Sequence, residues 1–344
     1  MRKILFRVDA SVVMGYGHIL RCISLANYCI ERSIPCLFIL KDSDEKVEAI
    51  LQNNDLAYKI IRDESDILKI DEDQPGRIVV LDVNNPVLFK KGNDYSSYIS
   101  LLKQNSFTVV AFEEMTEDVF PSNLVIIPYV GADVTKHGDT ADTKYLLGPS
   151  FFVFREEFLN APKFIINDTV KDIFICMGGS DPDMLTEKIL AWIAAYPLGF
   201  NLNIVFARLS DVRKTTIEKI LQGYKGAYRI HVDPSFISSI IASSDMGIIN
   251  SGLIKYETSV LGLPCITVSN EMAHEPIMKL FGGNESIYHL GLAGQVSEKL
   301  LHEAISCMTG DSNRRKIMSQ KCITMFDGKG KERIYANLLQ LKIN

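Results

Sequence analysis

The chain has 344 residues, which is too many for one ordinary hydrophobic core, so about two domains are expected. Hydrophobic residues make up 47% and charged residues 23% of the sequence, a balance that excludes a mostly disordered chain. The formal net charge of −5 and the scattered distribution of the basic residues argue against nucleic acid as a partner.

The sequence gives no sign of export or of membrane insertion. The apolar run near the N-terminus is too short for a signal peptide, which needs about 7–15 apolar residues, and no run approaches the roughly 20 residues of a membrane span. The seven cysteines are odd in number and form no CxxC pair, so neither a zinc site nor a redox motif is indicated. We expect a cytoplasmic protein with buried free thiols and no metal or cofactor.

The first half of the chain alternates short apolar strands with amphipathic helices. The strands are expected at 3–8, 35–40, 77–82, 107–112 and 124–127, and the helices at 17–32, 44–53 and 95–104. Such alternation predicts a parallel sheet covered by helices on both faces.

A second set of strands and helices follows an interruption within 151–171, where Pro162 falls. The strands are expected at 172–177, 201–206, 228–231, 246–250 and 264–268, and the helices at 183–196, 211–222, 235–243 and 254–261. The sequence therefore predicts two doubly wound α/β domains, over 1–160 and 161–327. We expect a cleft between them, because open α/β sheets bind ligands beyond the carboxyl ends of their strands.

The first polar constellation, at 9–21, follows the first expected strand and opens the first helix. Gly15 and Gly17 permit a tight turn and close approach of the backbone to a ligand. His18 then lies in the first helical turn, facing the expected cleft, where it can take a proton from a nucleophile. Because a helix N-terminus disfavours imidazolium, we expect a neutral histidine that acts as a base. The alternative is a histidine that only hydrogen-bonds within its own loop.

The second constellation, Gly178-Gly179-Ser180-Asp181-Pro182, follows the first strand of the second domain. Consecutive glycines expose backbone N–H groups, and a helix that begins near 182–183 adds its positive end, so together they predict a diphosphate site. Asp181 would repel that anion if it pointed inward, and we expect it to be an outward-facing helix cap. The alternative is an ordinary glycine turn.

The third constellation begins at the end of the strand 246–250. Gly252 opens another helix, whose amides can hold phosphate. Glu257 lies inside that helix, where a carboxylate can accept hydrogen bonds from both hydroxyls of a ribose; the alternative is a solvated acidic position. The loop 269–275 would close the sugar end of the site, with His274 as a second polar candidate.

These blocks, in this order, resemble the GT-B superfamily. Within it they resemble the UDP-2,4-diacetamido-2,4,6-trideoxy-β-L-altropyranose hydrolases of pseudaminic acid synthesis, the related spore coat polysaccharide biosynthesis proteins and, more distantly, the N-acetylglucosaminyl transferase of peptidoglycan synthesis. The opening block is specific to the hydrolase-like group, and the other blocks indicate GT-B generally. The match runs nearly end to end and includes Arg7-Val-Asp9, Gly15-Tyr-Gly17-His18-Ile-Leu-Arg21-Cys22, Leu147-Gly148-Pro149, Phe154-Arg155-Glu156-Glu157-Phe158, Gly178-Gly179-Ser180-Asp181-Pro182, Tyr256-Glu257 and Asp327-Gly328-Lys329-Gly330.

The resemblance implies two Rossmann-like domains, with the C-terminal segment 328–344 crossing back to pack on the first. It implies that UDP binds to the second domain, that no metal is needed, and that His18 is the base that activates water for attack at the anomeric carbon. The candidate substrate-binding residues are Gly15, Tyr16, Gly17, Arg21, Asp82, Asn84, Gly178, Gly179, Ser180, Ser251, Gly252, Glu257, Ala273 and His274.

The chain departs from the resembled hydrolases at two places. They typically carry Asp-His-Tyr at the end of a central strand, where this chain has Asp82-Val83-Asn84, and Glu-Asn-Gln in the late loop, where it has Met272-Ala273-His274. Both changes fall where the sugar, and not the nucleotide, is expected. The resemblance therefore implies UDP binding together with a different or altered sugar substrate.

Three functions are consistent with these residues. The first is hydrolysis of a UDP-sugar to UDP and a free acetamido or diacetamido deoxy sugar, for synthesis of a surface glycan of the nonulosonic acid type. The second is a GT-B glycosyltransferase in which His18 deprotonates an acceptor hydroxyl instead of water. The third is a catalytically silent protein that binds a UDP-sugar, because Asn84 and Ala273 replace groups that the resembled hydrolases carry.

Overall fold

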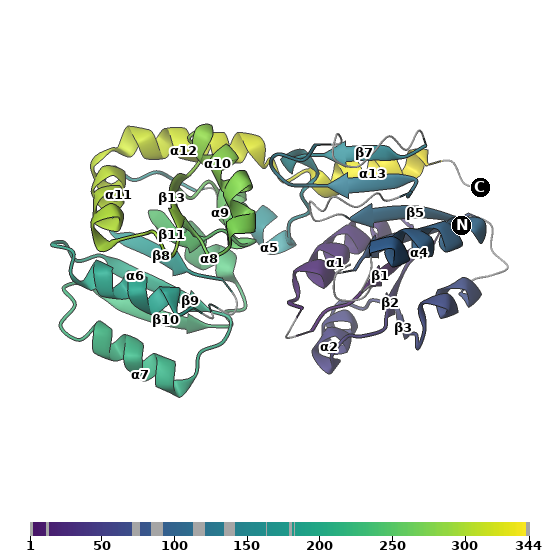
Figure 1. Ribbon diagram of the computed structural model, residues 1–344, viewed down its shortest axis with the longest axis horizontal. Helices are drawn as coiled ribbons and strands as arrows, with labels where there is room; N and C mark the ends of the chain where they lie inside the picture. Colours follow the sequence, from purple (N-terminus) through teal and green to yellow (C-terminus); the bar gives the residue numbers. More distant parts are fainter. Residues whose placement is uncertain are drawn as a thin grey trace. The chain divides into compact units, whose positions relative to one another are not determined.

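Two separate parallel sheets form the framework of the chain (Figure 1). The computed structural model groups the chain into two units, Met1–Arg155 with Gly328–Asn344, and Glu156–Asp327. It describes residues 3–11, 14–70, 76–83, 92–112, 121–133, 142–162, 164–178, 181 and 183–341, with the backbone alone at 92–94.

The first unit contains seven strands in the order β3-β2-β1-β4-β5-β6-β7, and each neighbouring pair is parallel. The strands are β1 (Ile4–Val8), β2 (Cys36–Leu40), β3 (Tyr58–Ile60), β4 (Arg77–Asp82), β5 (Phe107–Phe112), β6 (Leu124–Ile127) and β7 (Lys144–Leu147). The sequence predicted the five central strands from their apolar runs. It missed β3 and β7, because these short edge strands carry lysine and are partly exposed.

Helices cover both faces of this sheet. Phe6 of β1 points into a core that it shares with α1 (Gly17–Ile30), α2 (Glu45–Asn53) and α13 (Gly330–Gln340). Helix α13 packs on α1, so the C-terminal end of the chain returns to the first unit (Figure 1). The helix α4 (Gly92–Gln104) packs against β5. The described part of the unit also contains the 3-10 turns η1 (Glu64–Lys69) and η3 (Pro149–Phe151).

The Arg7-Val-Asp9 motif stabilises the framework of the first unit. The Arg7 side chain is fully buried, and its guanidinium contacts Asp9 at 2.6 Å and Glu64 at 2.6 and 2.9 Å. Asp9 accepts hydrogen bonds from the backbone N–H groups of Lys41 and Asp42 at 2.8 and 3.0 Å. The buried charges therefore join the ends of β1 and β2 to η1, and a buried arginine is tolerated because both carboxylates pair with it.

The second unit contains six strands in the order β10-β9-β8-β11-β12-β13, again with each neighbouring pair parallel. They are β8 (Asp172–Cys176), β9 (Asn201–Phe206), β10 (Tyr228–Val232), β11 (Met246–Asn250), β12 (Cys265–Ser269) and β13 (Tyr288–Leu292). The first five were predicted from the sequence. The edge strand β13 was missed, since it contains a histidine and a glycine and is only half-buried.

Helices cover both faces of the second sheet as well. One core contains side chains of α6 (Leu185–Ala194), α7 (Asp211–Ile220) and α11 (Glu298–Gly310), and the opposite core contains those of α5 (Glu156–Leu159), α8 (Ile237–Ala242) and α9 (Ile254–Leu261). The helix α10 (Glu275–Gly283) packs on β13, and α12 (Ser312–Met325) packs on α9. Within the described ranges, no helix is both long and apolar enough to cross a membrane.

Candidate functional site

The strand order reverses once in each sheet, and the described polar residues His18, Arg21, Asp82 and Ser251 of the predicted site lie at these two reversals. In the first sheet, β2 and β3 lie on one side of β1, and β4 and β5 lie on its other side. In the second sheet the order reverses in the same way between β8 and β11. The loops that leave the carboxyl ends of such strands diverge and open a crevice, which is the usual ligand site of doubly wound sheets. We call the β1/β4 reversal the first switch point and the β8/β11 reversal the second.

A tight turn leads from β1 into α1 at the first switch point. Gly15 adopts a positive φ of 81°, and its N–H donates to the Ser11 carbonyl at 2.7 Å. The next residue, Tyr16, donates its hydroxyl proton to the Asp44 carboxylate at 2.8 Å. Asp44 also caps α2 by accepting from the Val47 N–H. The turn is thereby attached to the start of α2, and α1 begins at Gly17 as the sequence predicted.

Three side chains of α1 converge on the carboxylate of Asp82 at the end of β4. His18 Nδ1 lies 2.8 Å from Asp82 Oδ1, and Arg21 contacts both oxygens, from Nε at 2.6 Å and from NH2 at 2.5 Å. Cys22 Sγ donates to Asp82 Oδ2 at 3.3 Å. The spacing of these residues in the sequence, i, i+3 and i+4, places them on one face of the helix.

The Asp82 carboxylate is buried, with 1% of its surface exposed. Burial alone would raise its pKa, but the charges and hydrogen bonds of Arg21 and His18 outweigh that effect and hold the pKa well below its ordinary value. Both oxygens are therefore ionised and already bonded within the protein. The sequence placed Asp82 among the substrate-binding residues, whereas its geometry suits the positioning of His18 and Arg21.

The contact with Asp82 also determines which nitrogen of His18 carries the proton. A carboxylate accepts hydrogen bonds but does not donate them, so Nδ1 at 2.8 Å from Oδ1 must be the N–H donor. Arg21 NH2 also lies 3.1 Å from His18 Nδ1. Because this NH2 group donates to Asp82, the short distance does not require Nδ1 to accept a hydrogen bond. Nε2 then carries the basic lone pair in the neutral ring, as in catalytic histidines that are oriented by a carboxylate.

Arg21 is fixed on its other sides by two aromatic residues. Its NH1 donates to the Tyr129 hydroxyl at 2.9 Å, and its guanidinium lies 4.7 Å from the centre of the Phe112 ring. Sequence reasoning did not select Tyr129 or Cys22. Cys22 could have been found from its spacing to His18 on α1, whereas Tyr129 follows a later strand whose position in the sheet the sequence does not give. Asn84, the other candidate near this site, lies outside the described residues.

Glycine and asparagine join the two loops of the second switch point. Gly178 adopts a positive φ of 88°, and a Cβ atom there would lie 2.5 Å from Asn250 Nδ2. Asn250 donates from Nδ2 to the Met177 carbonyl at 2.9 Å and accepts at Oδ1 from the Gly252 N–H at 3.1 Å. The Gly252 amide, which the sequence assigned to phosphate, is therefore bonded within the protein. Gly179 and Ser180 lie outside the described residues.

The start of α6 differs from the sequence prediction. The helix begins at Leu185, because Asp181 and Met184 adopt positive φ angles of 39° and 50°. Asp181 is buried rather than outward-facing, and its carboxylate accepts from the N–H groups of Leu185 and Thr186 at 2.9 and 3.1 Å. Arg213 of α7 pairs with it at 2.8 Å, which stabilises the buried charge. The outward placement expected for Asp181 was therefore wrong, and its carboxylate occupies the helix N-terminus that the sequence expected to contribute to a diphosphate site.

Among the described residues, no side chain caps the start of α9. Ser251, just before it, is buried, and its hydroxyl lies 2.8 Å from His274 Nδ1. Glu257 lies in the first turn of α9. Burial is the main cause that raises the pKa of Cys176 to about 12, and the charge of Glu257 adds to this increase. Glu257 therefore lies near the carboxyl end of β8, where the Gly178 loop begins. Ala273 is exposed, in the 3-10 turn η4 (Met272–His274).

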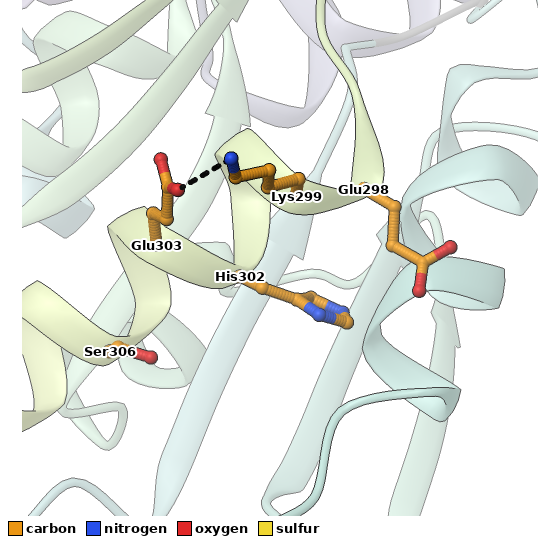
Figure 2. Close-up of a pocket in the computed structure, with 5 residues that line it drawn as sticks. All are labelled: Glu298, Lys299, His302, Glu303 and Ser306. Atoms are coloured by element: carbon orange, nitrogen blue, oxygen red, sulfur yellow. Dashed lines mark ion pairs between the residues drawn. The ribbon is translucent and has the colours of Figure 1, made fainter.

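A surface depression of about 640 Å³ lies on α11 (Figure 2). It is lined by Glu298, Lys299, His302, Glu303 and Ser306. Lys299 pairs with Glu303 at 3.8 Å, and His302 Nε2 lies 2.7 Å from the Trp192 carbonyl. The Ser306 hydroxyl lies 2.8 Å from that of Tyr196, and none of the five lining residues belongs to the predicted site. In the part of the chain that the structure describes, no group of three or more His, Cys, Asp or Glu residues could hold a metal ion.

No protein-family model matches the sequence. The chain is 26% identical to the uncharacterized protein MJ1062 of Methanocaldococcus jannaschii over 287 residues, which are 79% of this chain and 57% of that protein. It thus spans little more than half the length of this relative. It is also 23% identical to the spore coat polysaccharide biosynthesis protein SpsG of Bacillus subtilis, over 97% of this chain and 96% of that protein.

Solved structures resemble the chain over nearly its whole length. MurG of Acinetobacter baumannii superposes with a TM-score of 0.69 at 9% identity, covering 99% of this chain and 100% of MurG. UDP-GlcNAc 2-epimerase of Neisseria meningitidis bound to UDP-GlcNAc gives 0.66 at 12% identity over 98% and 100%, and the MnaA–UDP complex of Staphylococcus aureus gives 0.62 at 13% identity over 99% of both. The chain has the GT-B fold, with two Rossmann-like units, as its sequence predicted.

Proposed function

We propose that the chain is an enzyme that hydrolyses a UDP-sugar, releasing UDP and a free amino-sugar derivative. The observation that carries the proposal is the contact between His18 Nδ1 and the buried Asp82 carboxylate, which leaves Nε2 as a base at the first switch point. The names of the relatives support the substrate class, since two of the similar structures contain UDP or UDP-GlcNAc. The similarity to SpsG supports a role in synthesis of a surface polysaccharide.

In the proposed reaction, His18 Nε2 takes a proton from water as the water oxygen forms a bond to the anomeric carbon of the sugar. The bond between that carbon and the diphosphate oxygen breaks, and UDP leaves with the electron pair. Asp82 keeps the imidazole oriented and stabilises the positive charge that the ring gains. Arg21 keeps Asp82 ionised and in place. Each group in the first unit thus has a role that its contacts support.

Charge that develops on the leaving diphosphate needs hydrogen-bond donors, and we assign them to the second unit. The candidates are the backbone amides of the Gly178 loop and of the first turn of α9, which has no side-chain cap. Glu257 is assigned to the ribose hydroxyls, because it lies in the same first turn. A glycosyltransferase would use the same base and the same UDP site, with an acceptor hydroxyl in place of water.

UDP release from purified protein tests the proposal directly. The protein is incubated with a panel of UDP-amino sugars, with and without alcohol acceptors. Release without acceptor supports hydrolysis, whereas release only with acceptor supports transfer and removes the hydrolase assignment. Binding without release in either case supports a silent UDP-sugar-binding protein and removes the enzyme assignment.

The variant His18→Ala tests the proposed base. We expect UDP release to fall about 100-fold or more, because a positioned general base typically contributes that much. His302→Ala is the matched control, since that histidine also uses one nitrogen within the protein but lies on α11 in the second unit. Turnover that is unchanged in His18→Ala would remove this residue from the mechanism.

A further inference from the structure

A lysine amine is buried below the start of α9, close to the second switch point. Lys255 is 5% exposed, and its Nζ donates to the Ser251 carbonyl at 2.6 Å and to the Gly252 carbonyl at 3.2 Å. Nζ also lies 4.2 Å from the centre of the Tyr256 ring. The side chain therefore folds back toward the N-terminus of its own helix, which is the direction of the Cα–Cβ bond in an α-helix.

No carboxylate of the described residues lies within 4.0 Å of this amine. Glu157 on α5 and Glu257 on α9 form no ion pair with it, and α8 and β11 carry no charged residue. The charged residues of α12, which also packs on α9, are all cationic: Arg314, Arg315, Lys316 and Lys321. The titratable group that senses its charge is His274, whose pKa is lowered by burial and then by Lys255. Burial without a counter-ion lowers the pKa of Lys255 itself to about 7.

The contacts of Lys255 also orient the backbone at the start of α9. In a trans peptide the C=O and the following N–H point in opposite directions. Because the Gly252 carbonyl points to Nζ, the N–H of Leu253 points away from this amine, and Leu253 as a residue is 49% exposed. Leu253, the N-cap residue of α9, therefore presents its amide on the side of this peptide that faces away from the buried Lys255 amine.

The two helix starts of this unit differ in charge. At α6 the carboxylate of Asp181 occupies the helix N-terminus, and Arg213 pairs with that carboxylate. At α9 the Lys255 amine lies beneath the positive helix end, and no carboxylate of the described residues pairs with it; its protonated form adds a second positive charge there. An anion at the outer side of the α9 turn would supply a counter-ion.

We propose that Lys255 is a positioning residue that holds the Ser251–Gly252 turn for a diphosphate at the start of α9 and takes up a proton from solvent when the diphosphate binds. This inference rests on the proposed function, since it concerns the diphosphate of the same UDP-sugar. The charge state of Lys255 is then linked to ligand binding. A ligand that binds the protonated form of the protein more tightly causes the protein to take up protons when the ligand binds.

The sign of the expected pH dependence follows from this linkage. Below the pKa of Lys255 in the ligand-free protein, near 7, the amine is already protonated and binding requires no proton. Above it, each binding event must protonate the amine first, and the affinity falls by up to about tenfold per pH unit until the pKa of the complex is reached. Proton uptake should therefore approach one per diphosphate at pH about 8 to 9.

The test is calorimetric titration of the full chain with UDP, in two buffers of different ionisation enthalpy. Measurements above about pH 8 avoid the terminal phosphate of UDP, which is fully ionised there. We expect the wild type to take up nearly one proton per UDP bound and Lys255→Met to take up none. We also expect Lys255→Met at pH about 7 to bind UDP only as tightly as the wild type does near pH 9. Lys188→Met is the matched control, because Lys188 also contacts a carbonyl and an aromatic ring in this unit but is exposed.

Several outcomes overturn the inference. Wild-type protein that binds UDP above pH about 8 without proton uptake overturns it whatever the variants do, so the test does not depend on the folding of Lys255→Met. Equal proton uptake in wild type and Lys255→Met overturns it as well. Both results leave UDP binding and the proposed function intact. Wild-type protein that binds no UDP at any pH removes the proposed function and this inference together.

Discussion

The two switch points occupy equivalent places in their sheets but are built from different groups. At the first, the ionisable side chains of His18, Arg21 and Asp82 bond to one another on a rigid helix and strand. At the second, the main chain and neutral groups dominate, with Asn250 joining the Gly178 loop to the Gly252 turn. Proton transfer requires one side chain held in one orientation, whereas an anion is held by several amides at once. We therefore expect the removal of a single side chain to disable the first site. The second site should be disabled by a substitution that alters its backbone.

The largest effect is expected from Asp82→Asn, which breaks the first switch point. The variant removes the buried carboxylate that pairs with Arg21, and breaking a buried pair typically costs about 3–5 kcal/mol of unfolding free energy. The measurement is urea unfolding followed by circular dichroism, with Cys22→Ser as the control, because that change keeps a donor to the same carboxylate. UDP release should also fall, while UDP affinity stays unchanged. A cost no larger than that of Cys22→Ser would contradict the role assigned to Asp82.

The pH dependence of the same variant provides a second measurement. Burial opposes ionisation of Asp82, but Arg21 and His18 hold its pKa below the ordinary value of about 3.9. A carboxylate with a lowered folded pKa stabilises the protein above the unfolded pKa and loses that contribution as the pH falls through the folded pKa. The difference in unfolding free energy between wild type and Asp82→Asn should narrow as the pH falls below about 4. A difference that stays constant on acidification is not consistent with this pairing.

Gly178→Ala should break the second switch point with a smaller effect. The positive φ alone costs an alanine about 1–2 kcal/mol, and the new Cβ would also displace Asn250, 2.5 Å away, from its two backbone contacts. Gly223→Ala is the matched control, since Gly223 has a φ of 78° and no atom within 4 Å of an added Cβ. We expect Gly178→Ala to be about 2 kcal/mol less stable than the control.

UDP affinity separates local damage at Gly178 from general destabilisation. It should fall about tenfold or more in Gly178→Ala, because losing even a single hydrogen bond to a charged group costs at least about 1.5 kcal/mol, and it should stay unchanged in Gly223→Ala. Equal UDP affinities in the two variants would exclude the Gly178 loop from the binding site.

The sequence predicted the central strands and the candidate residues of both switch points, because apolar runs and glycine-containing turns are local signals. It did not predict the pairing of Arg21 with Asp82, 61 residues apart, which depends on β1 lying next to β4. It also misplaced Asp181, because the local argument from charge repulsion could not include Arg213, 32 residues later. Lys255 went unselected because the sequence gives no sign that its amine is buried. Contacts between distant segments are thus what the sequence left undetermined.

The smallest effect on UDP binding is expected from a substitution of Glu257. This substitution tests whether the second switch point binds a nucleotide. Glu257→Ala removes a carboxylate from the first turn of α9, and we expect UDP affinity to fall about tenfold, since a hydrogen bond to a charged group contributes about 1.5–3 kcal/mol. Binding of 2′-deoxy-UDP completes a double-mutant cycle: removal of the hydroxyl should weaken binding to the wild type but not to Glu257→Ala. If the losses in binding free energy from the protein change and from the ligand change add, Glu257 does not bind the ribose. Its effect on UDP affinity would then come from its charge near the Cys176 end of β8.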